Sequence, residues 1–321
     1  MRVIEKIEKY REIKMRRKII QQAKQAYTIT LPIEWVKSSK LKVGDEIEMI
    51  SSGKDLIIKT DNKQFGGEIT IDATNMNTRI LYNYLNAAYS GGFDQVEVIY
   101  PNMEMLDLNQ MIGFAVVNQK KDSCTIKDIS GSTFENLDDI FKQVFQTVIS
   151  FYEFAIEDIS NEKKGTTSSI RKKDDDINKY TLFLERSMIK KGSTDSVMRK
   201  IMFTYAFELE KIGDNIFRIW DSEVLEEKTD KTTIELLILS RQCCEKAFAV
   251  FYQTSPEKIK EILSLRDTVK TKTEQALKKH KNSRKAIIYA LSIVEDCVDL
   301  THLSLMYRQK MNQIQKRTED I

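Results

Sequence analysis

Apolar residues in the first part of the chain come in short runs, and this pattern predicts strands. Between residues 17 and 60 one of the runs alternates apolar and polar side chains with period two. Pro32 suits the first position of a short helix, and the glycines at 44 and 53 suit hairpin turns. Because about 45 residues of short strands bury little surface alone, we expect this segment to dimerise. The expected strands are 19–20, 27–30, 46–49 and 56–58.

A mixed pattern follows, after the break at Gly66-Gly67. Alternating apolar runs predict strands, a run with helical spacing ends at Gly91-Gly92, and a further apolar stretch is interpreted as a second helix. These elements predict a small α/β segment. Its expected strands are 68–71, 96–100 and 125–129, and its expected helices are 76–89 and 106–117.

From residue 135 the apolar spacing becomes 3.6 and stays so, which predicts six helices. Short polar or glycine-containing breaks separate them, so they form two consecutive three-helix units. The fold class is therefore multidomain and mainly α, with domains at 1–62, 67–131 and 133–317. The expected breaks lie near 161–167, 191–194, 227–231, 253–255 and 281–283.

Composition excludes several classes of protein. No apolar run reaches the roughly 18 residues of a membrane-spanning helix, and the first residues lack the apolar core of a signal peptide, so we expect a cytoplasmic protein. The four cysteines show no CxxC spacing and are interpreted as reduced, small apolar residues. With two histidines and without a glycine-rich phosphate loop, an HExxH motif or a nucleophile elbow, the chain is not expected to be an enzyme.

Charge is uneven along the chain. Residues 1–24 hold nine Lys and Arg against three Glu, a net +6, so the remainder of this +3 chain carries about −3. Such a basic N-terminal module is expected when one end of a protein attracts phosphate backbones. A solvated basic tail is the other interpretation that charge alone permits.

Two acidic pairs recur 85 residues apart, Glu210 with Asp214 and Glu295 with Asp299. Residues four apart share one helix face, and at 100° per residue both pairs lie beside an apolar stripe, the first among phenylalanines. A poorly solvated carboxylate must be paired, protonated or bound to a cation. The sequence leaves open ion pairs with neighbouring helices or a metal site, which would favour Mg, Ca or Mn, with iron or zinc as alternatives. His302 is a further metal ligand or an ordinary core residue.

The stretch 209–216, Leu-Glu-Lys-Ile-Gly-Asp-Asn-Ile, resembles the hallmark of the PhoU family, and the six-helix layout of 133–317 fits that family. The resemblance implies two three-helix repeats whose Glu/Asp-xxx-Asp pairs bind metal, and a role in sensing phosphate supply. On the second helix of each repeat the second acid is lost, as Asn178 and Thr271, which implies one weakly bound ion or none in place of a full cluster. The implied metal ligands are Glu210, Asp214, Glu295, Asp299, Asp174 and Asp267.

The segment with Leu31-Pro32 followed by Gly44-Asp45 resembles the AbrB/MazE swapped-hairpin domain. The resemblance implies that two chains interlock their hairpins and that basic residues of the first strand and loop contact DNA, with Arg and Lys on phosphates and Arg or Gln on base edges. The implied DNA-binding residues are Arg16, Arg17, Lys18, Gln22, Lys24, Gln25 and Lys37.

Together the two resemblances imply a homodimeric, DNA-binding transcriptional regulator of phosphate uptake or metabolism with a metal-binding sensory domain. The alternative is an accessory protein that docks on a phosphate transporter or kinase and uses its N-terminal domain only to dimerise. DNA binding by the basic residues of 14–25 distinguishes the two.

Overall fold

The fold is taken from a computed structural model that describes residues 16–24, 26–52, 55–60, 67–100, 103–130, 137–160, 167–190, 196–224, 229–279 and 283–319. The chain divides into two compact units, Met1–Lys63 and Gln64–Ile321. Gln25 and most of the basic stretch of 1–24, namely residues 1–15, lie outside the described residues.

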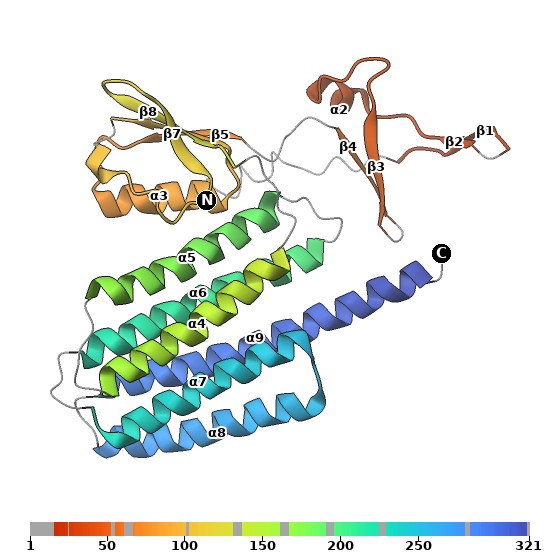
Figure 1. The fold of residues 1–321 in the computed structure, drawn as a ribbon. Coiled ribbons are helices and arrows are strands. Elements are labelled where there is room, and N and C mark those ends of the chain that lie inside the picture. Colours follow the sequence, from red (N-terminus) through yellow and green to blue (C-terminus); the bar gives the residue numbers. More distant parts are fainter. Residues whose placement is uncertain are drawn as a thin grey trace, which may run out of the picture. The chain divides into compact units, whose positions relative to one another are not determined.

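In the part of the first unit that the structure describes, there are two hairpins and a short helix (Figure 1). Strands β1 (Ile20–Ala23) and β2 (Ala26–Thr28) pair antiparallel, and so do β3 (Ile47–Ser52) and β4 (Asp55–Thr60). Helix α2 (Ile33–Ser38) lies between the hairpins, directly after Pro32. The four predicted strands and the short helix are confirmed.

The described residues of the first unit form no core of their own. None of its described side chains is buried, and large apolar residues are exposed, among them Ile20 (54%), Tyr27 (66%) and Met49 (63%). A folded segment of this size gains too little from apolar burial to be stable with these side chains in water. Its apolar surface therefore needs a partner.

A four-stranded sheet opens the second unit. Its strands are β5 (Glu68–Asp72), β6 (Gln95–Ile99), β7 (Phe114–Gln119) and β8 (Ser123–Asp128), in the order β5-β6-β8-β7. Only the β5–β6 pair is parallel, and helix α3 (Thr78–Ser90) connects those two strands. Leu81, Leu85 and Tyr89 of α3 are buried in one cluster with sheet residues, so the helix covers one face of the sheet. We call residues 67–130 the α/β segment.

The prediction of a helix at 106–117 is wrong. That stretch follows a short 3₁₀ helix, η2 (Met103–Met105), and its end belongs to strand β7. Gly113 has φ +88°, a left-handed conformation that ends any helix, and the apolar run after it pairs with β8. An apolar run of this length has no clear period, so the distant partner strand decides its structure.

The six predicted helices are confirmed, and so is the break near 253–255, whereas the other predicted breaks lie largely outside the described residues. They are α4 (Leu137–Ser160), α5 (Thr167–Lys190), α6 (Ser196–Glu223), α7 (Lys231–Tyr252), α8 (Pro256–Lys279) and α9 (Arg284–Glu319). Helices α4, α5 and α6 pack on one another, as do α7, α8 and α9, and the two groups meet through α6 with α9 and α4 with α7. No described helix is long and apolar enough to cross a membrane.

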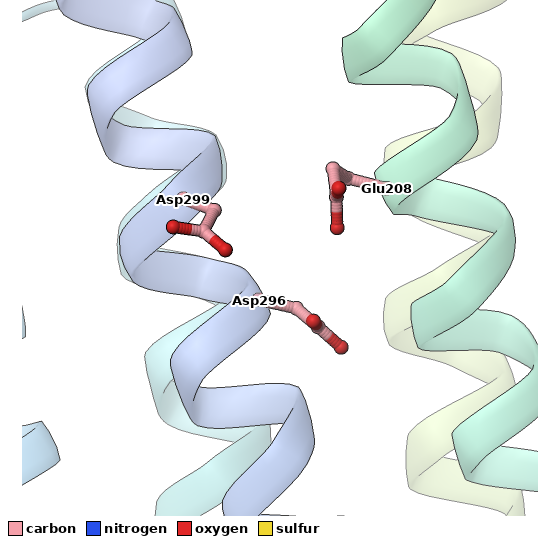
Figure 2. Close-up of side chains that lie close together, drawn as sticks. All are labelled: Glu208, Asp296 and Asp299. Carbon is pink, nitrogen blue, oxygen red and sulfur yellow. The ribbon is translucent and has the colours of Figure 1, made fainter.

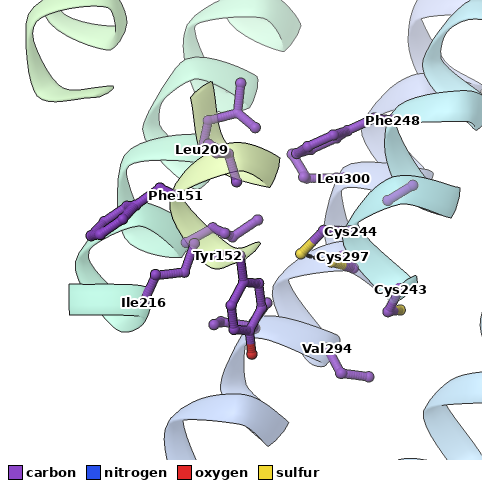
Figure 3. Close-up of a cluster of buried hydrophobic side chains, with 14 of the residues drawn as sticks. Phe151, Tyr152, Leu209, Ile216, Cys243, Cys244, Phe248, Val294, Cys297 and Leu300 are labelled. Carbon is purple, nitrogen blue, oxygen red and sulfur yellow. Dashed lines mark hydrogen bonds between the residues drawn. The ribbon is translucent and has the colours of Figure 1, made fainter. Parts of the chain in front are cut away.

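One continuous core joins the two three-helix groups. Phe145 of α4 stacks on Phe248 of α7 with ring centroids 4.3 Å apart. Figure 3 shows Cys243, Cys244 and Cys297 within this core, where all three are free thiols with no exposed surface. Cys297 lies 3.5 Å from Cys244 (Sγ to Sγ), and burial raises the pKa of its thiol well above the ordinary range. These cysteines fill the core as small apolar residues.

Candidate functional site

The predicted DNA-binding residues lie on the surface of the first unit. Arg16, Arg17 and Lys18 precede β1, Gln22 is in β1, and Lys24 is in the turn after it; all are exposed. We call residues 16–28 the basic hairpin. It holds four Lys and Arg and no acid. Its positive charge is therefore not offset within its own sequence.

Lys37 is exposed in the last turn of α2. It lies outside the basic hairpin in sequence and in secondary structure, so it remains a predicted DNA contact at the edge of that surface. Among the described residues, the structure thus places the candidate cations on one hairpin and one short helix.

Helices α5 and α6 bring Asp174, Asn178, Glu210 and Asp214 to one place, which we call the α5–α6 oxygen cluster. Gly213 permits the close approach of the helices, because a Cβ there would lie 3.1 Å from Ile177 of α5. Burial, followed by the charges of Asp214, Asp175 and Glu210, raises the pKa of Asp174 to about 7.

The oxygen cluster is only partly satisfied. Burial and the charge of Asp214 raise the pKa of Glu210. Arg218 pairs with Asp214 at 2.6 Å. By contrast, Asp174 Oδ1 and Asn178 Oδ1 are buried and have no hydrogen-bond partner among the described residues. Buried oxygens without a donor are costly, so a donor or a cation at these two oxygens would stabilise the cluster.

A second carboxylate group lies between α6 and α9. Figure 2 shows Glu208 facing Asp296 and Asp299, and one ligand atom from each lies within 4.8 Å of the others. Lys211 Nζ is 2.6 Å from Glu208 and 3.0 Å from Asp296. Despite that lysine, burial raises the pKa of Asp296. Ion pairs with Lys211 therefore account for Glu208 and Asp296. Of the three acids, only Asp299 was a predicted metal ligand.

The predicted metal ligands outside the α5–α6 oxygen cluster are exposed to solvent. Asp267, Glu295 and Asp299 are exposed, and Arg266 pairs with Asp267 at 2.9 Å. His302 is exposed as well. Glu295 faces outward, contrary to the prediction that it lies beside the core. The buried face of α9 runs instead through Ile293, Cys297, Leu300 and Ser304. Burial therefore gives these acids no need of a cation.

Glu185 of α5 was missed by sequence reasoning. It is 7% exposed, and burial together with the charge of Glu210 raises its pKa to about 7. A signal was present: Asp174, Asn178, Thr181 and Glu185 are spaced by four, three and four residues, so they share one face of α5. A polar stripe on a core-facing helix marks buried acids.

We expect Glu185→Gln to stabilise the protein at high pH. The pKa of about 7 lies above the usual 4.5, so the folded chain keeps a proton that the unfolded chain releases. Glu185 therefore lowers stability progressively as pH rises from about 4.5 to about 7. The neutral amide should raise the free energy of unfolding by at most roughly 3 kcal/mol at pH 8 and by little at pH 4.5.

Urea unfolding at several pH values measures this effect. Glu157→Gln, on the exposed side of α4, is the control and should leave the pH profile unchanged. Equal gains from Glu185→Gln at pH 4.5 and pH 8 would mean that Glu185 is ionised throughout.

Comparison with known proteins assigns part of the chain. Residues 20–64 match the family model described as "Antidote-toxin recognition MazE, bacterial antitoxin". No curated protein matches the chain. The matched residues span both hairpins and α2. A MazE/AbrB-like domain therefore occupies residues 20–64.

Proposed function

We propose that this protein is a DNA-binding transcriptional regulator that acts as a homodimer and catalyses no reaction. The basic hairpin carries the proposal. Lys24 lies within the MazE/AbrB-like match, Arg16, Arg17 and Lys18 come just before it, and all four cations are exposed. Lys and Arg at such a surface bind phosphates, and Gln22 has the donor and acceptor needed to read a base edge.

The exposed apolar side chains of the first unit support dimerisation. The exposed side chains of Ile20, Tyr27 and Met49 become buried if a second copy packs its hairpins against them. A dimer also doubles every DNA contact. Both requirements are met by one assembly.

Binding to duplex DNA should fall steeply with salt. If three of Arg16, Arg17, Lys18 and Lys24 contact phosphates in each chain, a dimer neutralises about six, and log K should fall with log salt at a slope of about −5. Fluorescence anisotropy with a labelled duplex across a KCl series measures the slope. Failure to bind at low salt would favour the alternative in which the protein docks on a phosphate transporter or kinase.

For the helical region we propose a PhoU-like sensory domain that links phosphate supply to DNA binding. Support comes from the sequence of 209–216 and from two groups of three packed helices. The α5–α6 oxygen cluster fits a cation, since it has two buried oxygens without partners. Only oxygens are offered, so Mg or Mn fits better than iron or zinc. A bound ion would supply positive charge where carboxylates are crowded.

Manganese should raise the melting temperature by several degrees. Binding to the folded state alone contributes about 2.7 kcal/mol at a concentration 100-fold above Kd. The double change Asp174→Asn and Glu210→Gln should remove the shift, and Glu157→Gln should retain it. Glu295, Asp299 and Asp267 remain predicted ligands, but as exposed acids they should contribute less.

Elemental analysis of protein purified without chelator is the companion measurement. We expect a divalent ion in the parent and its loss in the double variant. Absence of any metal, with melting unchanged by Mg, Mn, Fe or Zn, would leave ion pairs as the account of these acids.

A further inference from the structure

Helix α3 of the α/β segment packs on α5 (Figure 1), and side chains link the segment to α5 at two places. Near the end of α5, Arg186 donates to the Tyr89 carbonyl at 2.7 Å and pairs with Asp128 at 2.7 Å. Three turns earlier on the same helix, Asp175 accepts a hydrogen bond of 2.6 Å from Gln110 Nε2. The segment therefore spans the part of α5 that carries the oxygen cluster.

The second link lies beside the oxygen cluster, because Asp175 directly follows Asp174 in α5. The Tyr82 hydroxyl donates to Gln110 Oε1, so Tyr82, Gln110 and Asp175 form one hydrogen-bonded chain from α3 to α5. Burial, followed by the charges of four acids, raises the pKa of Tyr82 to about 12; the acids are Asp107, Asp175, Glu210 and Asp174. Asn86, one turn further along α3, also has a buried Oδ1 without a partner among the described residues.

The second three-helix group provides an internal comparison. Its matching acids, Asp267, Glu295 and Asp299, are exposed. Among the described residues, α3 packs on α5, whereas α8 and α9 pack mainly on other helices of the six-helix region. The set of acids that lies where the α/β segment packs on α5 is thus the more buried of the two.

We propose that the α/β segment completes the cation site of the α5–α6 oxygen cluster, with Tyr82 and Gln110 closing over a divalent ion such as Mn²⁺. The inference rests on the metal site of the proposed function and deepens it. Ion binding and docking of the segment on α5 then stabilise each other, because coupling between two equilibria is reciprocal.

Hydrogen–deuterium exchange of the full chain, with and without Mn²⁺, tests the coupling. We expect slower exchange of the α3 amides, residues 78–90, when Mn²⁺ is added. The double variant Tyr82→Phe and Gln110→Ala should bind Mn²⁺ about tenfold more weakly and lose the effect on α3. The control Glu295→Gln with Asp299→Asn changes the exposed acids and should keep it.

Two results overturn the inference and are distinguishable. If Mn²⁺ binds, by electron paramagnetic resonance, with the same affinity in the Tyr82/Gln110 variant and α3 exchange does not respond, the segment is no part of the site although the metal site stands. If no Mn²⁺ binds the parent, the metal site of the proposed function fails, and this inference fails with it. Melting of the variant without metal shows whether it is folded.

Discussion

A chain that begins at Gly67 should sediment as a monomer, whereas the full chain should sediment as a dimer. The first unit exposes its apolar side chains, and the second has its own buried cores in the α/β segment and the helices. Removing the first unit therefore removes the surface that needs a partner but leaves a part that can fold. Sedimentation velocity at two protein concentrations measures the difference.

A point change in the full chain provides a matched test. Met49→Asp places a charge on the exposed apolar surface of β3 and should shift the full chain toward monomer, because an unpaired carboxylate is costly to bury in an interface. Lys42→Asp, in the exposed turn before that strand, should leave the dimer intact. A dimer formed by the fragment from Gly67 would show that the helical region holds the assembly.

Arg186→Met should weaken docking of the α/β segment by roughly 3 kcal/mol or more, the usual cost of removing one partner of a buried ion pair. Arg186 is 1% exposed, donates to the Tyr89 carbonyl, and pairs with Asp128, whose side chain is 5% exposed. Methionine fills a similar volume but leaves Asp128 with only Lys190 as its cationic partner in that ion-pair group. Urea unfolding should show an earlier transition, and limited proteolysis should cut within 67–130.

The pH dependence gives this prediction a signature. Burial opposes ionisation of Asp128, yet hydrogen bonds from Ser130 and Arg186 lower its pKa to about 2. The stability that ionised Asp128 contributes is present above about pH 4 and is lost as pH falls through about 2. The difference between parent and Arg186→Met should therefore shrink in strong acid. Arg171→Met, on the exposed side of α5, should cost less than about 1 kcal/mol at any pH.

Local patterns in the sequence were sufficient for most elements. The six helices could be predicted because apolar residues recur with period 3.6 and polar or glycine-containing stretches interrupt them. The β3–β4 hairpin could be predicted from Gly53 between its strands, whereas Gly44, also predicted in a hairpin turn, lies between α2 and β3. The end of 106–117 could not, because its strand forms by pairing with β8, and only the fold brings that partner near.

The candidate site divides in the same way. That Glu210 and Asp214 share a face follows from their spacing within one helix. The contributions of Tyr82, Gln110 and Asp175 depend on how the α/β segment docks, which no local pattern encodes. The prediction that Glu295 lies beside the core was wrong. A small rotation of a helix decides whether a flanking residue faces a neighbouring helix or water, and sequence alone does not fix the rotation of α9.

The salt dependence of DNA binding in a matched pair of variants tests the central claim most directly. Arg17→Gln with Lys18→Gln removes two positive charges from the basic hairpin, and Lys40→Gln with Lys42→Gln removes two from the exposed loop after α2. We predict weaker binding and a slope flatter by about 3 to 4 for the first pair, since four phosphate contacts vanish per dimer. The second pair should keep the parent slope of about −5. Equal affinity and an unchanged slope for the Arg17/Lys18 variant would contradict DNA binding through the basic hairpin.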